Sequence, residues 1–479
     1  MMVHAAGPDG HRDLDQFAAA VGSPVWRPGD AGYDSAVSTW NVARPLRPAT
    51  VVEALNAQDV AAAVRWAARH GMAIGAHSTG HGAVSNAEGG LLVSTRALDS
   101  VEVDAASRLA TVGAGARLGA LTAAAAPYGL ATVQGSTGSV GVGGFISGGG
   151  LGVMSRTFGL AADHVVSMDV VTVDGELRTV DATHDPDLFW ALRGGKGNFG
   201  IITAIRMSLL PLRSFYGGGV FFDGAHASAV LHAYRTWTAG HSDRTSSSVA
   251  LLRLPPDPAL PELIRGRFVV HVRMAHAGDP AEGRQHAADI GRAAPVLLDL
   301  MSEMPAAALD GVHMDPPGPL PFFDRGGLLD RLPTEAIDAL VRVVAEPGSP
   351  LTLVDLRLMG GAIADPNGAA PDAVPGRQAA FNLFSLVPDI PPFAQAAPGA
   401  VAALFAALDP WLSGGALPNF LGRRSDPADV LAAWPVAQRG RLLAAKRRWD
   451  PDNLFRIGHA LLESSDDRTL QDGYREAAS

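Results

Sequence analysis

The chain has 479 residues with 38 basic and 48 acidic side chains, which gives a formal net charge of −10 at pH 7. Its length exceeds the usual size of one hydrophobic core and predicts two domains. No basic stripe offsets the negative charge, so nucleic acid is not expected as a partner. Cysteine is absent, which excludes disulfides, thiolate nucleophiles and cysteine-ligated metals.

The sequence also lacks the patterns of membrane insertion and export. No apolar run approaches the roughly 20 residues that cross a bilayer as a helix. Residues 1–16 alternate charged, polar and small side chains, without the basic start and apolar centre of a secretory signal. We therefore expect no membrane partner and a cytoplasmic location.

The first half of the chain alternates strand-like and helix-like segments, which is typical of layered folds of helices and sheets. Helices are expected at 57–70, 118–127 and 188–193. Strands are expected at 50–54, 72–76, 91–94, 100–104, 109–112 and 201–210. Residues 165–173 and 177–180 predict a hairpin, because Asp174-Gly175 supplies the positive φ angles of a tight turn.

The pattern changes at about residue 214. Strand-like stretches are separated there by long Ala-rich helices, which predicts one antiparallel sheet covered by helices. These stretches lie at 249–254, 268–274, 351–358 and 381–387. We expect residues 315–327 to form an ordered loop, and residues 439–448 a basic helix that stops before Pro451.

The segment GSTGSVGVGGFISGGGLG at 135–152 is the most unusual part of the chain. Apolar residues alternate with its glycines, where a flexible linker would carry serine or other polar residues. Glycine lets backbone N–H groups approach an anion or a flat ring closely. The segment therefore favours a cofactor with phosphates and a conjugated ring over a simple packed turn.

Residues 195–200 match the dinucleotide fingerprint G-x-G-x-x-G only formally. That motif needs a strand before the glycines and a helix after them. Here a predicted helix precedes them and a predicted strand follows, so we expect no Rossmann nucleotide site. The loop remains a possible contact of another cofactor.

His81 lies in STGHG at 78–82, a run of small residues that follows a predicted strand. Such a run leaves backbone amides free to hold phosphate oxygens. Taken alone, a histidine beside glycine is more often a turn residue than a cofactor attachment site.

The wider combination of motifs is specific. It comprises STGHG at 78–82, VGVGGFISGGGLG at 140–152, GLAADHV at 159–165, LRGGKGNFGIIT at 192–203 and KRRWDPDNLF at 446–455. Together these segments resemble berberine bridge enzyme-like flavoproteins of the vanillyl-alcohol oxidase / p-cresol methylhydroxylase (PCMH) superfamily. LRLMGGAI at 356–363 resembles a strand of that family's substrate domain.

The resemblance implies an α+β fold with two domains. A PCMH-type FAD-binding domain would be built from residues 1–213 and 415–479, with its core at about 45–212. Residues 214–414 would form a substrate domain of antiparallel sheet covered by helices.

The resemblance also implies covalent FAD. His81 matches the histidine that bonds to the flavin 8α-methyl in that family, although Thr79 replaces one glycine of the pattern. Thr137 stands where many members carry a second, cysteinyl attachment, so only one covalent link is expected. An 8α-substituent raises the flavin potential and helps it to accept a hydride.

Further cofactor contacts are implied by position. The two loops would hold the pyrophosphate and the isoalloxazine, a second group would line the adenine side, and one residue of DPDN would contact the ring region. The loops contribute His77, Ser78, Thr79, Gly80, His81, Gly82, Thr137, Ser139, Val140, Gly141, Gly143 and Gly144. The adenine side would be lined by Gly148, Leu151, Gly152, Gly200 and Ile202, and the ring region contacted by Asn453.

The catalytic base is not identified by the resemblance. Family members often place a tyrosine before an Asn-Phe pair, but the matching stretch here is LPNF at 417–420. Strand alternation predicts that substrate-domain strands present charged pairs on one face, with a further carboxylate in the loop that follows. The resulting candidates are His271, Arg273, Asp355, Arg357 and Asp372, for each of which a structural ion pair is the alternative.

These observations predict an FAD-dependent oxidoreductase that moves a hydride from a small alcohol, sugar or secondary metabolite to flavin N5, with no metal. Val140 matches a position near the flavin carbon where oxygen reacts, and its small size favours oxygen as the acceptor. The alternatives are a dehydrogenase with another electron acceptor, a flavin-binding protein without turnover, and an α/β protein without flavin.

Overall fold

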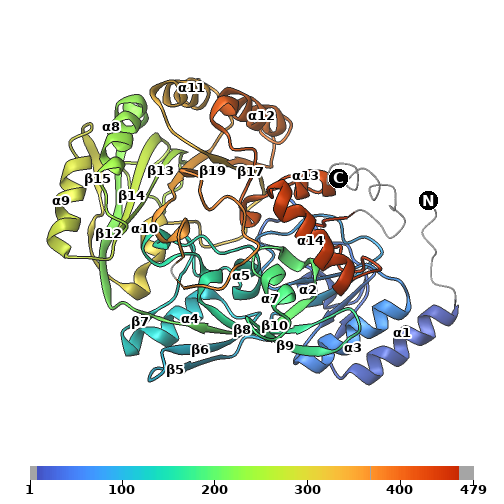
Figure 1. The fold of residues 1–479 in the computed structure, drawn as a ribbon. Helices are drawn as coiled ribbons and strands as arrows, with labels where there is room; N and C mark the ends of the chain where they lie inside the picture. The colour runs from blue at the N-terminus through green and yellow to red at the C-terminus, as the bar shows by residue number, and fades with distance from the viewer. Residues whose placement is uncertain (1–7, 367, 463–479) are drawn as a thin grey trace, which may run out of the picture.

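The computed structural model describes residues 8–366 and 368–462. Two small sheets lie side by side in one part of the molecule, and one large sheet lies across the other part (Figure 1). Among the described residues, no helix combines the length and apolar character needed to cross a bilayer.

The first sheet has the order β1-β2-β4-β3, and its last three strands are parallel. Its strands are β1 (Val25–Trp26), β2 (Thr50–Glu53), β4 (Leu91–Ser94) and β3 (Ile74–His77). Helix α3 (Ala57–Arg69) connects β2 to β3, and the Asn56 side chain caps it by accepting from the Asp59 N–H. The structure confirms the predicted strands β2, β3 and β4 and the predicted helix α3 within two residues at each end, whereas β1 was not predicted.

The amino-terminal stretch holds a helix that the sequence analysis did not expect. Helix α1 (Pro8–Val21) packs on α3, and Phe17 stacks on Trp66 with 5.1 Å between ring centroids. A short helix α2 (Tyr33–Ala36) follows. Polar residues on the outer face of α1 hid the apolar stripe that it buries.

The second sheet is antiparallel, with the order β5-β6-β10-β8-β9. Its strands are β5 (Val101–Asp104), β6 (Leu109–Gly113), β10 (Ile201–Ser208), β8 (Val165–Val171) and β9 (Leu177–Asp181). The predicted hairpin is β8–β9, and Gly175 in its turn has φ +74°. Helices α4 (Leu118–Ala125), α5 (Val142–Ser147), α6 (Ser155–Phe158) and α7 (Pro186–Leu192) and the strand pair β7 (Leu130–Ala131) and β11 (Leu210–Pro211) complete this part.

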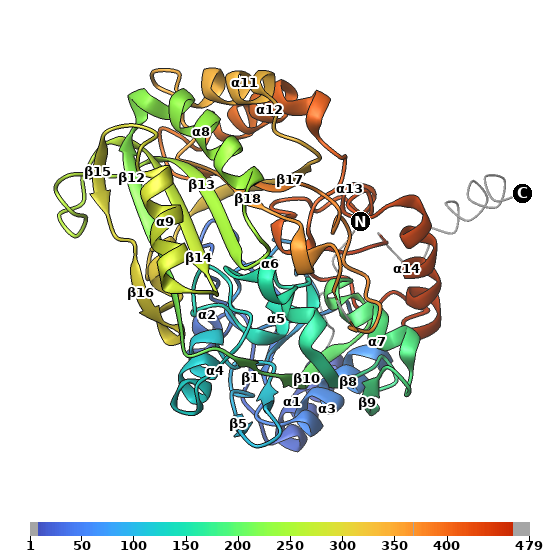
Figure 2. The same ribbon diagram turned by 60° about the vertical axis from the view of Figure 1, so that its left-hand side comes forward.

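The large sheet is antiparallel and runs β15-β12-β14-β13-β18-β19-β17, with β16 also paired to β12. Its strands are β12 (Ser214–Asp223), β13 (Thr245–Arg253), β14 (Phe268–His276), β15 (Val296–Asp299), β16 (Ser302–Pro305), β17 (Phe322–Leu329), β18 (Leu353–Leu358) and β19 (Phe381–Pro388). Helices α8 (Ala227–Ala239), α9 (Pro280–Ile290), α11 (Thr334–Val344) and α12 (Ala397–Leu408) lie on its outer side (Figure 2). The α+β fold with a helix-covered antiparallel sheet is therefore confirmed.

Side-chain alternation gives the large sheet two different faces. Val270 and Val272 join the apolar core beneath the helices, whereas His271 and Arg273 point to the opposite face. That opposite face lies over the smaller sheets, where helix α10 (Asp310–His313) is also placed.

The prediction of a loop over residues 315–327 was wrong in its second half, where strand β17 pairs with β19. Gly326 and Gly327 lowered the strand signal there. A Cβ at Gly326 would lie 2.4 Å from the Phe420 carbonyl oxygen, so the packing of the carboxy-terminal return requires glycine in this strand. The glycines at 217–219 lowered the strand signal of β12 in the same way.

The last helices return to the first part of the molecule. Helix α13 (Pro427–Leu431) is followed by α14 (Val436–Trp449), which lies beside α7 and ends before Pro451 as predicted. The buried Lys446 ammonium donates to Asp450 Oδ2 at 2.6 Å, to the Asn198 carbonyl at 2.9 Å and to the Phe455 carbonyl at 2.8 Å. Phe455 in turn bridges to Ile74 on β3.

We expect Lys446→Met to lower the free energy of unfolding by about 3–5 kcal/mol, because it leaves the Asp450 carboxylate buried without its cation. The exposed neighbour Arg447, changed to alanine, is the control and should alter it by about 0.5 kcal/mol or less. Urea denaturation of both variants measures the difference. Equal midpoints for the two variants would contradict the role of Lys446.

Candidate active site

The loop after β3 and the loop before α5 meet at a close backbone contact. The Ser78 hydroxyl donates to the Gly115 carbonyl at 3.2 Å, and the Gly141 N–H donates to Thr79 Oγ1 at 3.3 Å. A Cβ at Gly141 would lie 2.6 Å from Ser78 Oγ, so glycine lets the two loops approach this closely without a shift of the Ser78 side chain. The structure thus brings together the two loops that the sequence analysis assigned to one cofactor.

His81 lies between these loops. Its Nδ1 is 2.8 Å from Thr79 Oγ1, its Nε2 is 3.4 Å from Ser139 Oγ, and its ring stacks on Trp40 at 4.3 Å. Burial, with a smaller contribution from Arg117, lowers the pKa of His81 to about 4. The imidazole is therefore neutral at pH 7 and carries a lone pair on one nitrogen.

Backbone donors near His81 are free. Within residues 8–366 and 368–462, the N–H groups of residues 79–82 and of Val140 donate no hydrogen bond. Several unpaired N–H groups on neighbouring turns form an anion-binding concavity, which suits the diphosphate of a dinucleotide.

A half-buried cation adjoins the same loops. Lys196 Nζ donates to Asn419 Oδ1 at 2.5 Å, and Asn419 Nδ2 donates to the Phe145 carbonyl at 2.8 Å. A Cβ at Gly82 would lie 3.9 Å from Lys196 Nζ, and one at Gly148 would overlap Asn419. Burial lowers the pKa of Lys196 to about 8, so the ammonium stays protonated at pH 7.

Sequence reasoning did not assign Lys196 or Asn419. The only signal was their position, in the glycine loop at 195–200 and in LPNF at 417–420. The loop has the order that the sequence predicted, with α7 before the glycines and β10 after them, so it is not a Rossmann motif.

The other residues that were predicted to contact the cofactor lie on several different elements. His77 Nε2 is 2.8 Å from the Ala36 carbonyl, and Gly200 and Ile202 lie buried at the start of β10. Asn453 Nδ2 donates to the Leu462 carbonyl at 3.2 Å, while its Oδ1 is buried and has no partner among the described residues. Thr137 Oγ1 is 2.9 Å from Ser139 Oγ, on the His81 side of the loop.

Gly143 and Gly144 differ in the space around them. A Cβ at Gly143 would lie 2.9 Å from the Ala114 carbonyl oxygen, whereas one at Gly144 would meet nothing within 4 Å. Gly144 is exposed on the amino-terminal turn of α5 and presents open space beside the two loops. Taken together, the free N–H groups, the neutral histidine, the half-buried lysine and this open space fit FAD.

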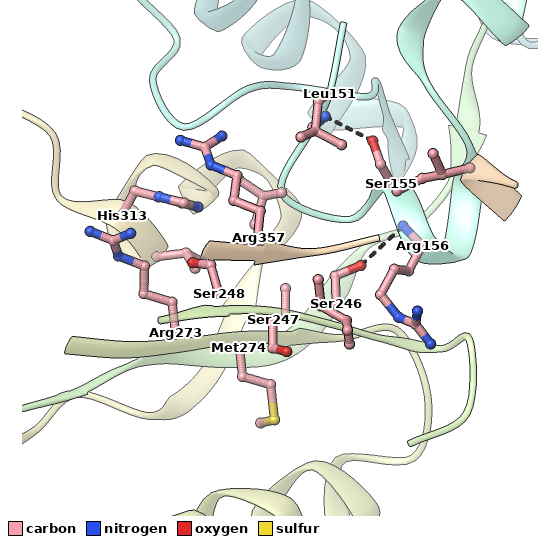
Figure 3. A pocket seen from close by; sticks show the side chains of 16 residues that line it. Leu151, Ser155, Arg156, Ser246, Ser247, Ser248, Arg273, Met274, His313 and Arg357 are labelled. Carbon is pink, nitrogen blue, oxygen red and sulfur yellow. Dashed lines mark hydrogen bonds between the residues drawn. The ribbon is translucent and has the colours of Figure 1, made fainter. Parts of the chain in front are cut away.

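A polar pocket lies between the end of the glycine-rich segment at 135–152 and the large sheet (Figure 3). Leu151 and Gly152 line it from the side of the glycine-rich loop. Its polar lining consists of Ser155, Arg156, Ser246, Ser247, Ser248, Arg273, His313 and Arg357.

Four of the five predicted catalytic candidates form one buried network at this pocket. Asp355 accepts from Arg273 Nη1 at 3.1 Å and from Arg357 Nε at 2.8 Å. Arg273 Nε donates to His271 Nδ1 at 3.1 Å. The register explains the cluster, because Ser248 on β13 is the partner of both arginines.

The network gives the pocket positive charge. Two guanidinium groups face one carboxylate, and burial together with Arg273 lowers the pKa of His271 well below its ordinary value, so this imidazole is neutral. Asp355 is engaged on both oxygens and therefore positions the arginines rather than accepting a proton. Such a site suits an anionic or hydroxyl-rich ligand.

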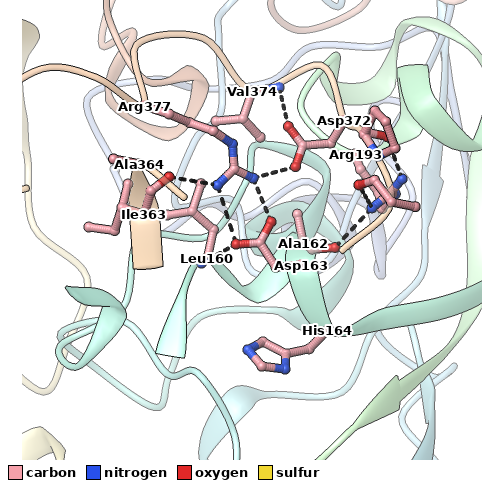
Figure 4. A network of polar contacts seen from close by, with 12 residues as sticks. Leu160, Ala162, Asp163, His164, Arg193, Ile363, Ala364, Asp372, Val374 and Arg377 are labelled. Atoms are coloured by element: carbon pink, nitrogen blue, oxygen red, sulfur yellow. Dashed lines mark hydrogen bonds and ion pairs between the residues drawn. The ribbon is translucent and has the colours of Figure 1, made fainter. Parts of the chain in front are cut away.

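Asp372 lies outside this network (Figure 4). It accepts from Arg377, which also donates to Asp163 at 2.5 Å, and from the Val374 N–H at 2.9 Å. The neighbouring Arg193 guanidinium donates to the Pro371 carbonyl at 2.7 Å. These contacts fasten the loop that carries Asp372 to the first part of the chain, so the structure does not bring Asp372 together with the other four candidates.

A carboxyl group that the sequence analysis did not single out also interacts with the two arginines of the pocket. The Ser136 hydroxyl and the guanidinium groups of Arg273 and Arg357 favour the charged form of the Asp315 carboxyl group. Burial raises the pKa of Asp315 above its ordinary value. Asp315 was included only in the expected loop at 315–327, where no local pattern marked it.

Comparisons with known proteins agree with this site. Residues 48–181 match a family model described as an FAD binding domain. The chain is 35% identical over 196 residues to (R)-6-hydroxynicotine oxidase of Paenarthrobacter nicotinovorans, a match that covers 40% of this chain and 43% of that protein. The chain thus matches less than half the length of this curated relative.

Solved structures agree over a longer stretch. BBE-like 1 of Physcomitrella patens has a TM-score of 0.80 at 20% identity, covering 94% of this chain and 99% of that one. The glucooligosaccharide oxidase of Acremonium strictum, described with a 6-S-cysteinyl, 8α-N1-histidyl FAD, has the same TM-score, identity and coverage. At this identity the likeness establishes a shared fold.

We expect Gly144→Ala to keep the fold but to reduce the amount of flavin bound, because the added methyl group enters the open space beside the loops. Gly440→Ala is the matched control, since its Cβ also meets nothing within 4 Å on exposed helix α14. Each change should stabilise its helix by about 0.5–1 kcal/mol when no flavin is present. The flavin-to-protein absorbance ratio and the thermal midpoint separate the two effects, and equal flavin content in both variants would contradict the placement.

Proposed function

We propose that this chain, which carries an FAD binding domain on the fold of the berberine bridge enzyme-like flavoproteins, is an FAD-dependent oxidase of a small polar organic molecule. The observation that carries the proposal is that the arginine pocket is lined on one side by Leu151 and Gly152, the end of the glycine-rich segment at 135–152. Bound FAD would supply a hydride acceptor at N5 and pass the electron pair to oxygen.

Residues 1–213 and 415–479 are proposed as the FAD-binding domain, and residues 214–414 as the substrate domain. The first strand of the large sheet, β12, begins at Ser214, and the last helix that covers the sheet, α12, ends at Leu408. These limits support the division. Arg156 helps to hold the two together, since its Nε donates to the Thr245 carbonyl at 3.0 Å and its guanidinium also donates to the Met359 carbonyl.

The chain's own groups would hold the cofactor in three ways. The free N–H groups at 79–82 and Val140 would bind the diphosphate, and the Lys196 ammonium would place a positive charge beside the flavin. His81 would be the covalent anchor, supported by the histidyl FAD of the glucooligosaccharide oxidase. A cysteinyl link is excluded because the chain has no cysteine.

The substrate would bind through Arg357 and Arg273, with Ser248 between them. Asp355 holds both guanidinium groups in place, so their remaining N–H groups can donate to hydroxyl or carboxylate oxygens. We therefore propose a sugar acid, a polyol or a sugar as the substrate class, in preference to an apolar alcohol.

Asp315 would act as the base that takes the substrate hydroxyl proton while the hydride leaves the adjacent carbon. Burial raises the pKa of Asp315, which makes its carboxylate a better proton acceptor than that of an exposed aspartate. The arginines would stabilise negative charge that develops on the substrate oxygen.

Oxygen is the proposed electron acceptor, supported by the small, half-buried Val140 beside the His81 loops. A panel of sugars, sugar acids and alcohols tests the proposal through stoichiometric hydrogen peroxide. Flavin reduction without peroxide would favour a dehydrogenase with another acceptor. Flavin that no compound reduces would favour a binding protein without turnover.

We expect the wild-type protein to keep its yellow colour in an acid-precipitated pellet, and His81→Ala to release its flavin into the supernatant. The reason is that the neutral His81 imidazole is the nucleophile of the link. His77→Ala is the control from the same loop and should keep the colour in the pellet, since His77 Nε2 is engaged by the Ala36 carbonyl. Release of all flavin by the wild type would remove the covalent link from the proposal.

We expect Asp315→Asn to slow flavin reduction by about 10²–10⁴-fold, the usual contribution of a general base. In the wild type, kcat/KM should fall as the pH drops through the raised pKa of Asp315, because the protonated carboxyl cannot accept a proton. The Asn variant should lack this acid limb. Asp372→Asn, which changes a carboxylate outside the pocket, should retain it; an unchanged acid limb in Asp315→Asn would rule out this base.

A further inference from the structure

A cluster of histidines lies on the far side of the large sheet from the pocket. It combines His276, the last residue of β14, with Glu282 and His286 on helix α9. His276 is three residues beyond Arg273 on the same strand, so the two side chains point to opposite faces. The cluster is therefore separate from the flavin site.

The three side chains converge at distances suited to one cation. His276 Nε2 lies 3.6 Å from Glu282 Oε2, and His286 Nε2 lies 3.6 Å from Glu282 Oε1. One donor atom from each residue falls within 4.8 Å of the other two. Tetrahedral zinc with bonds of 2.0–2.1 Å needs donor atoms about 3.4 Å apart, which is close to these separations.

Unpartnered buried nitrogens point to a missing ligand. The His276 side chain is 0% exposed, yet its Nε2 has no hydrogen-bond partner among the described residues. The buried Nε2 of His286 also has none within that part of the chain. A buried polar atom without a partner costs stability, so such atoms usually have a ligand.

The orientation of His276 is set by a hydroxyl group. Its Nδ1 lies 2.9 Å from Oγ1 of Thr245, a buried residue at the start of β13. With the proton on Nδ1 donated to this oxygen, the lone pair of Nε2 is directed at the cluster. A polar partner on the second ring nitrogen is the usual companion of a metal-bound histidine.

We propose that His276, Glu282 and His286 bind one divalent transition-metal ion, with zinc as the ion that fits this donor set. Two imidazoles and one carboxylate suit zinc, whereas calcium and magnesium prefer oxygen ligands alone. The Glu282 side chain is 45% exposed and leaves a path from solvent. The ion would pin the first turns of α9 to the end of β14.

His241 lies beside the cluster. Its ring centroid lies 4.3 Å from that of His286, and both of its ring nitrogens are buried without a partner among the described residues. The sequence held one local signal of this site, the i, i+4 spacing of Glu282 and His286, which places both on one helix face.

The test uses the untagged, flavin-loaded full chain after treatment with a chelator. Titration calorimetry with zinc should show one tight ion per chain, and the thermal midpoint should rise with zinc. Glu282→Gln, which changes a half-exposed side chain, and His286→Gln should abolish both effects while the flavin spectrum stays that of the wild type. His232→Gln on α8 is the control, because this histidine pairs with Asp338 outside the cluster and should leave zinc binding unchanged.

A second variant separates a built site from loose binding to surface histidines. Thr245→Val should weaken zinc binding by about 10–100-fold, the usual effect of removing such a partner, and should leave the stoichiometry at one. The proposal is overturned if the wild type shows no saturable binding of one ion, or if Glu282→Gln and His286→Gln bind zinc as the wild type does. None of these readouts depends on the proposed oxidase activity.

Discussion

The buried Lys446 ammonium joins three stretches of chain that are far apart in sequence. It bonds to the loop at 195–200 through Asn198, to the turn after α14 through Asp450 and to the carboxy-terminal strand-like stretch through Phe455. A buried ammonium is tolerable only when all of its protons are donated, and here all three are. The position of β3 against Phe455, and of the loop that β3 leads into, depends on this contact.

The proposed cofactor site is formed where the loop after β3 and the loop before α5 approach each other closely. The loop after β3 carries His81, and glycine at residue 141 lets the loop before α5 approach the Ser78 side chain closely. Lys196 belongs to the same 195–200 loop that Lys446 contacts, and its Nζ lies near Gly82 and Gly148. The groups that are proposed to meet a flavin phosphate or ring are in this way set by backbone geometry more than by side-chain identity.

The substrate side depends on electrostatics instead. Asp355 is fully engaged by Arg273 and Arg357, and this arrangement keeps two positive charges at the pocket wall in a fixed orientation. Asp315 interacts electrostatically with both arginines and with Ser136 of the glycine-rich segment. Arg44, Arg156 and Arg377 each donate a hydrogen bond that joins residues 1–213 to residues 214–414.

The sequence by itself determined the α+β class, most strands to within a few residues, the cofactor loops and the pairing of His271 with Arg273 and of Asp355 with Arg357. These follow from local periodicity, turn chemistry and glycine-rich motifs, which are properties of neighbouring residues. Strands β12 and β17 were missed because their glycines lower strand propensity and are required only by partners distant in sequence, His271 and Phe420. Tertiary structure alone decided that Asp315, Lys196 and Asn419 join the proposed site and that Asp372 does not. It also decided that His276 meets Glu282 and His286. Each of these contacts joins separate elements, and the spacing of such elements in the sequence carries no signal.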